Sequence, residues 1–242
     1  MPQIWGVVQQ ALPTAATDGS QKQIRVDRYG SPIVYPLGAG FNSLAAEGSY
    51  YRACNTTMGT GIAMGIQAAF SDTANVLFVI RNLAVINGPN IHMDYIRLLN
   101  TAAGLTSTSC NLAVVLDTGN RYSTGGTQLF PLNMNTALGS QSVADLRYNC
   151  TATAATAKRQ VSRAVVKTQA APCFTIGDQI YLNFGSNASG MGALSGAAAI
   201  NISIDCGPCC VAPNSSMLIH MWNPGNATTA PSWEFELGWW ER

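Results

Sequence analysis

The sequence predicts an all-β fold, a jelly-roll-like β-sandwich that follows an extended N-terminal arm. Runs rich in Val, Ile, Leu and Phe recur along the chain, separated by Gly, Pro, Asn and Ser. They start about 15 to 20 residues apart, a spacing that favours a sandwich or jelly roll. The C-terminal run alternates apolar and polar residues with a period of two, which is the pattern of a half-buried strand. Helical periodicity is weak throughout.

The chain divides into an arm and one domain. Residues 1–23 are rich in Gln, Ala, Thr and Pro and lack periodicity, so we expect an arm that is ordered by a partner. Its apolar residues Ile4 and Trp5 are candidate subunit contacts. Residues 24–242 are expected to form a single β-sandwich domain without an internal repeat.

The strand-like runs can be placed in order. Residues 75–86 and 91–99 flank Gly88-Pro89-Asn90 and predict a hairpin with a short loop. The remaining strands are expected at 23–29, 112–116, 128–132, 143–150, 161–168, 179–184, 200–204, 217–222 and 233–239. Residues 61–70 are expected to form a short helix.

The last expected strand shows the alternation most clearly. Within 233–237 the apolar residues occupy the odd positions and two glutamates the even ones. Trp239 and Trp240 follow, and burying one such side chain is worth roughly 2–3 kcal/mol. We therefore expect this end of the chain to be docked. A place in the core is favoured for both tryptophans, and a subunit interface is the alternative.

Charge is unusually scarce. Only 10% of residues are Asp, Glu, Lys or Arg and the net charge is +1, against roughly 25% charged residues in an average domain. Because charge normally keeps a protein surface hydrated and monomeric, we expect neighbouring subunits to cover much of this surface.

The same composition excludes several partners. The densest basic stretch, residues 158–167, holds four Lys or Arg and is too thin for a nucleic-acid footprint. Arg81 and Asn82 interrupt the longest apolar run, residues 74–86, so no membrane span is expected. No signal peptide is visible at the start of the chain, and an odd number of cysteines, seven, argues against a disulfide framework.

No catalytic motif stands out. The sequence lacks the Gly-x-Ser-x-Gly elbow and the phosphate-binding loop. The triplet Asp117-Thr118-Gly119 is like that of aspartic proteases, but the second Asp that such chemistry needs has no counterpart. His92 and His220 both lie within strand-like runs, where a structural role is favoured. We therefore expect neither an enzyme nor a cofactor.

The sharpest local motif is Cys206-Gly207-Pro208-Cys209-Cys210. A structural turn is the favoured interpretation. A metal site or an inter-subunit disulfide through Cys206, Cys209 and Cys210 stays open, although a second ligand pair is not apparent in the sequence. A redox dithiol ranks last because no βαβ pattern surrounds the motif.

Several short segments of the sequence, taken together, resemble those of a known group of proteins. They are Arg28-Tyr29-Gly30-Ser31-Pro32, Glu47-Gly48-Ser49-Tyr50-Tyr51, Leu116-Asp117 with Arg121-Tyr122-Ser123, and the ending at residues 234–242. With these segments, the chain resembles structural proteins of tailed double-stranded DNA bacteriophages, of the cement or decoration kind. The resemblance implies a jelly-roll sandwich, often a homotrimer, that binds the major capsid protein on the virion surface. Such a protein is made in the host bacterial cytoplasm and binds neither nucleic acid nor a membrane.

Two other function classes remain. The chain is longer than the small decoration proteins, which leaves a spike or tail component open. In that setting a carbohydrate- or receptor-binding jelly roll is the alternative, with Tyr122 or Trp222-Asn223 as candidate exposed aromatics. A hydrolase that uses Asp117 or His220 is a third class, which we do not expect.

Overall fold

The structure is a computed structural model. It describes residues 40–55, 57–66, 69–74, 76–102, 109–139, 141–168, 174–185, 201–224 and 230–242. The expected arm, with Ile4 and Trp5, the expected strand at 23–29 and the rest of residues 24–39 lie outside the described residues.

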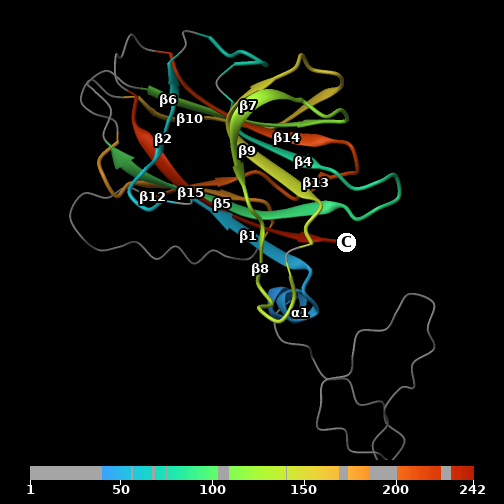
Figure 1. Cartoon of the computed structure of the whole chain (residues 1–242). Helices are drawn as coiled ribbons and strands as arrows, with labels where there is room; N and C mark the ends of the chain where they lie inside the picture. The colour runs from blue at the N-terminus through green and yellow to red at the C-terminus, as the bar shows by residue number, and fades with distance from the viewer. Residues whose placement is uncertain are drawn as a thin grey trace, which may run out of the picture.

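Fifteen strands and one helix make up the described part (Figure 1). In chain order they are α1 (Gly40–Glu47), β1 (Tyr50–Cys54), β2 (Ile62–Ala63), β3 (Gly65–Ile66), β4 (Val76–Asn82), β5 (Ile91–Ala102), β6 (Ser109–Asp117), β7 (Tyr122–Leu129), β8 (Leu132–Asn133), β9 (Ala144–Ala152), β10 (Lys158–Thr168), β11 (Gln179–Asn183), β12 (Asn201–Asp205), β13 (Cys210–Val211), β14 (Ser216–Asn223) and β15 (Ser232–Glu241).

The strands form two sheets that pack face to face, so the expected all-β sandwich is confirmed. Sheet I has the order β12-β11-β5-β15-β1-β8, with β13 beside β5 and β2 beside β15. Sheet II has the order β10-β6-β14-β4-β9-β7, with β3 beside β14. The pairs β11·β12 and β14·β3 are parallel, and the other described pairs are antiparallel.

Eight of the strands are paired as a nested set. The antiparallel pairs are β1·β15, β4·β14, β5·β11 and β6·β10, so early strands pair with late ones. These pairs alternate between sheet I and sheet II. Contacts of β15 with β5 and of β14 with β6 then join them into continuous sheets. The last strand of the chain therefore lies in the middle of sheet I, between β1 and β5.

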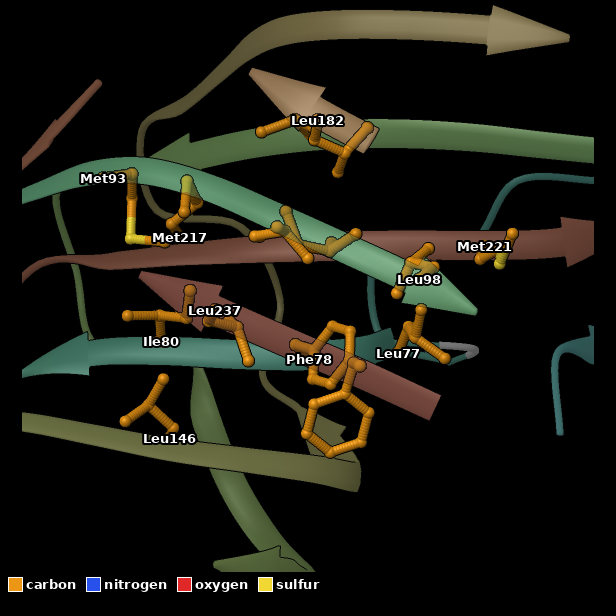
Figure 2. Packing of buried hydrophobic residues seen from close by; sticks show 14 of the residues in the cluster. Leu77, Phe78, Ile80, Met93, Leu98, Leu146, Leu182, Met217, Met221 and Leu237 are labelled. Atoms are coloured by element: carbon orange, nitrogen blue, oxygen red, sulfur yellow. The ribbon is translucent and has the colours of Figure 1, made fainter. Parts of the chain in front are cut away.

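The inner faces of the two sheets make one apolar core. Figure 2 shows side chains of β4, among them Phe78 and Ile80, interleaved with Leu237 of β15 and with Met93 and Leu98 of β5. The Phe78 ring meets the Phe235 ring edge to face, with centroids 4.4 Å apart. In β15 the apolar odd positions 233–237 point into this core and the two glutamates point out, as the alternation predicts.

The predicted hairpin of residues 75–86 and 91–99 is wrong. β4 lies in sheet II and β5 in sheet I, and the loop between them crosses the sandwich end. Both strands are buried at most positions, which suits two central strands of separate sheets better than one half-exposed hairpin. The helix expected over 61–70 is also wrong, because β2 and β3 occupy it.

Candidate functional site

The two C-terminal tryptophans have different surroundings. Trp239 has 0% exposure, stacks on Tyr51 with centroids 6.0 Å apart and donates its Nε1–H to Glu241 at 3.0 Å. It therefore belongs to the core, the favoured placement, and its side chain is not available to a neighbour. Trp240 is partly exposed, and its ring lies parallel to that of His92 at 5.5 Å. Of the candidate interface residues that the structure describes, Trp240 is the one at the surface.

Trp240 lies in a cross-strand row at one end of sheet I. Cys210 is opposite His92, His92 is opposite Trp240, and Trp240 is opposite Tyr50. Burial lowers the pKa of His92, and the nearby positive charge of Arg242 lowers it further. The ring is therefore neutral at pH 7, which suits flat packing against an indole.

Beside this row an apolar tip projects from the sandwich. We give this name to Leu83, Val85 and Ile86, on the loop between β4 and β5. Val85 is 79% exposed and Ile86 is 77% exposed, and Leu83 is exposed as well. Figure 1 shows this loop extending beyond the strands, on the side where the C-terminus lies. This group of exposed apolar side chains makes the loop a candidate interaction surface.

Hydrogen bonds hold the base of the apolar tip firmly. Asn82, which is buried, donates to the carbonyl oxygens of Pro89 at 2.8 Å and Val211 at 2.9 Å, and accepts from the Ala84 N–H at 2.9 Å. The backbones of Asn90 and Arg242 exchange two further hydrogen bonds. The tip is thus presented in a fixed conformation.

A second group of exposed apolar side chains surrounds β8. Its members are Phe130, Leu132, Met134 and Leu138. The segment is tied to α1, because Asn135 donates to the Ala46 carbonyl oxygen at 2.9 Å. α1 lies beside β8, on the side of the sandwich that carries the C-terminus (Figure 1).

The cysteine motif is a turn between β12 and β13. Cys206 and Cys209 are buried, and their thiols point to the carbonyl oxygens of Ile204 at 3.9 Å and Gly207 at 3.5 Å. Burial raises the pKa of Cys206 to about 11 and that of Cys209 to about 12. Both are therefore protonated at neutral pH, which does not suit a redox nucleophile.

The positions of the three cysteines also matter for the alternative that they form a metal site. Cys210 is exposed, whereas Cys206 and Cys209 are buried. Among the residues that the structure describes, no three His, Cys, Asp or Glu side chains are placed to share an ion. Cys173 lies outside the described residues.

Asp117 is part of a buried structural cluster. Its carboxylate accepts from the backbone N–H groups of Gly119, Thr156 and Ala157, each at 3.0 Å, and from the Arg121 guanidinium at 3.2 Å. Burial alone would raise the pKa of Asp117, but the N–H groups and Arg121 together lower it. A carboxylate with every oxygen engaged in this way is not presented to a substrate.

Arg121 completes the cluster. Its side chain is fully buried and also donates to the carbonyl oxygens of Thr153 at 2.7 Å and Asp72 at 2.6 Å. Through these hydrogen bonds, Arg121 holds three loops together over the outer face of sheet II. The sequence gives little signal for this role, because the residue follows an apparent turn, where an exposed arginine is the usual case.

His220 lies on the outer face of sheet II and is almost fully buried. Its ring meets Phe70 edge to face at 5.0 Å. Burial, together with the positive charges of Arg121 and Lys158, lowers the pKa of His220 to about 4, although Asp72 and the nearby Ala74 backbone act in the opposite direction. Neither ring nitrogen makes a hydrogen bond of normal geometry with the described residues. His92 and His220 lie on different sheets, so they do not form a catalytic pair.

An open cavity of about 240 Å³ lies where β4 begins, which is the opposite end of that strand from the apolar tip. We call it the β4 cavity. It is lined by Ala63, Gly65, Val76, Leu77, Asn149, Cys150 and Met221. Val76, Leu77 and Met221 are almost fully buried, so polar atoms make up most of the surface that faces the cavity, and Asn149 is exposed.

The aromatic residues named for carbohydrate binding are not presented as that alternative requires. Trp222 and Asn223 are buried. The guanidinium groups of Arg81 and Arg147 lie over the Tyr122 ring, 4.4 Å and 4.7 Å from its centroid, so the ring already has cationic partners within the chain.

Comparisons with protein-family models, with curated proteins and with solved structures give no match for this chain. The one helix in the described part, α1, has eight residues and is too short to cross a membrane. The apolar tip is the surface feature that sequence reasoning missed. Its residues continue an apolar run, so the sequence pattern predicts a strand through residue 86, and only Gly88-Pro89-Asn90 indicates a loop.

Proposed function

We propose that this chain is a virion structural protein that assembles as a homo-oligomer, expected to be a trimer, on the outer capsid lattice of a tailed bacteriophage. There it adds contact area between capsid subunits, including the major capsid protein. It performs no chemistry in this role. Its effect is to raise the force or temperature at which the filled particle ruptures.

The strand connectivity supports this proposal. When a long hairpin of eight strands wraps into two sheets, the first strand pairs with the last, the second with the seventh, and so inward. The pairs β1·β15, β4·β14, β5·β11 and β6·β10 follow that order. We therefore propose a jelly-roll topology, which recurs in viral capsid domains and also in lectins.

The observation that best supports the proposal is the exposed apolar surface of a chain with few charges. A chain with only 10% charged residues presents Val85 and Ile86 almost fully to solvent on a loop fixed by hydrogen bonds. Exposed apolar groups on a rigid support lose little conformational entropy on binding and gain from removal of water. An interface of the standard size buries roughly 1,200–2,000 Å², and many such copies over a shell would add a large total contact area.

The test is quantitative mass spectrometry of purified particles of a phage that encodes the chain. Hundreds of copies per particle would support a shell component. A handful of copies would indicate a vertex or tail part, and absence from the particle would overturn the proposal.

Particle stability gives an independent measurement. Particles from a phage that lacks the gene should release DNA at a lower temperature, and addition of the purified protein should restore the original value. Unchanged release temperatures would contradict a stabilising role.

A further inference from the structure

We infer that the free edge of β10 is a docking site for an extended acidic segment of a partner protein, which adds to sheet II as a further strand. β10 is an outermost strand of sheet II and pairs with β6 along one side. The inference goes beyond the particle role proposed above and does not require it, because it concerns a surface of the single chain.

β10 is the longest of the four edge strands that the structure describes. β8 has two residues and β12 has five, whereas β10 has eleven. β7 has eight, but Gly125 and Gly126 within it both have a φ of 75°, a left-handed conformation that interrupts an extended strand. Eleven strand residues span roughly 35 Å, which is enough for a partner segment of ordinary strand length, about five or six residues.

The outer edge of β10 offers main-chain groups to a partner. A strand at the edge of a sheet presents a row of N–H and C=O groups that have no partner strand. Among the residues that the structure describes, none outside β6 forms a main-chain hydrogen bond with residues 158–165. These residues are exposed or partly exposed throughout. An extended peptide can therefore reach the edge and pair with both kinds of group, which is the basis of strand addition.

β10 also lies in the most basic part of the chain. Residues 146–177 hold five Lys or Arg and no Asp or Glu, in a chain whose net charge is +1. Arg159 and Arg163 are exposed and form no ion pair with the described residues, whereas Lys158 pairs with Asp72 at 2.9 Å. Two guanidinium groups without counter-ions, beside free main-chain groups, favour a segment that carries carboxylates.

The two arginines lie on opposite faces of the sheet. Arg159 is opposite Leu116, which packs against the core between the sheets. Arg163 is opposite Ala113, which belongs to the outer face, and a register shift between the two positions produces this arrangement. An added strand that follows the register of β6 meets the two arginines with residues three apart, one on each of its faces. The expected partner motif is therefore two acidic residues separated by two others.

The same features argue against two other occupants. A second copy of β10 would bring basic residues against basic residues, and like charges opposite one another destabilise a strand pair. A nucleic acid would meet the arginines through its phosphates. Phosphate oxygens accept hydrogen bonds and donate none, so the C=O groups of the edge would stay without partners.

Fluorescence anisotropy with a labelled peptide tests the inference. The probe is a fluorescein-labelled peptide of eight residues, with glutamate at its third and sixth positions, valine at its second, fifth and eighth, and threonine elsewhere. It should bind the full chain saturably, and more weakly as salt is raised. One control peptide carries lysine in place of glutamate. A second carries proline in place of valine, which keeps the charge but removes main-chain donors from both edges. Neither control should bind.

Variants of the chain locate the site. Arg159→Gln combined with Arg163→Gln should weaken peptide binding at least fivefold, because both charge contacts are lost. Arg97→Gln combined with Arg242→Gln is the matched control, since it removes the same charge elsewhere, at side chains that are 43% and 63% exposed. It should leave binding unchanged. Equal urea unfolding midpoints would establish that both variants are folded. In the wild type, bound peptide should slow hydrogen exchange of the amides of residues 159–165.

Four results would overturn the inference. Equal binding of the proline peptide would indicate charge attraction without strand addition. Tighter binding of a thymidine oligonucleotide that also displaces the peptide would indicate a nucleic-acid surface. Unchanged hydrogen exchange at residues 159–165, or no peptide binding at millimolar concentration, would leave the edge without the assigned role. The copy number in particles tests the virion function separately.

Discussion

Breaking the buried ion pair between Asp117 and Arg121 is expected to destabilise the sandwich strongly. Both side chains are fully buried, and Asp117→Asn removes the negative charge while it keeps the shape. It also replaces one carboxylate oxygen by an amide donor, which faces N–H groups of Thr156 or Ala157 that need an acceptor. Leaving a buried charge without its partner lowers the free energy of unfolding by about 3–5 kcal/mol.

The assay is urea unfolding followed by tryptophan fluorescence, with the slope of the transition checked for two-state behaviour. Asp72→Asn is the matched control. The Asp72 carboxylate pairs with Lys158 at a partly exposed site, while Arg121 binds only its backbone carbonyl. An exposed pair of this kind contributes about 0–1 kcal/mol.

The pH dependence of Asp117→Asn gives a second readout. Because the folded-state pKa of Asp117 lies below its unfolded value, its contribution is present above about pH 4 and is lost as the pH falls through the folded pKa. The wild type and Asp117→Asn should therefore converge in acid. A loss under about 1 kcal/mol at pH 7, no larger than that of the control, would refute the assigned role of the cluster.

Packing, titration and thiol exposure each give a further test. Gly238→Ala should destabilise the protein by about 1–3 kcal/mol, because the new Cβ would lie 2.5 Å from the Tyr95 ring. Gly139→Ala is the control and should be neutral in the same urea assay, because its new Cβ would meet no atom within 4 Å. Equal effects of the two substitutions would contradict this prediction. The folded pKa of His220 is about 4, below its unfolded value, so wild-type stability is retained above about pH 6.5 and falls by about 2 kcal/mol between pH 7 and pH 5. His220→Leu should reduce this loss of stability. An unchanged pH profile in the variant would argue against a buried neutral ring. In a Cys173→Ser protein, Cys54 and Cys210 should react at once with a colorimetric thiol reagent and the other described cysteines only after unfolding, whereas prompt reaction of a third thiol would contradict the assigned burial.

Most of the strands could be predicted because apolar β-branched runs between turn residues are a local signal. The runs expected at 143–150, 179–184 and 217–222 coincide closely with β9, β11 and β14. The elements that escaped prediction have weak local signals. β7 contains Gly125-Gly126, and α1 has only eight residues among small side chains. Both are held by contacts with distant parts of the chain.

The candidate site was harder to predict than the fold. The burial of Trp239 does follow from the sequence pattern, because it continues the alternation in which the odd positions of β15 face the core, whereas Trp240 falls on the other face. The apolar tip is exposed because β4 and β5 belong to different sheets, and strand runs alone do not say which sheet a strand joins. Likewise, the buried state of Arg121 follows from three loops that meet only in space.

The central place of β15 in sheet I has a consequence for biosynthesis. β15 fills the gap between β1 and β5, so sheet I cannot close until residues 232–241 have left the ribosome. Contacts of such long sequence separation make folding slow, and the nascent chain waits with two unfilled apolar strand edges. This order of assembly predicts that the protein depends on chaperones during its synthesis. It also predicts that soluble product is lost when translation stops before residue 232.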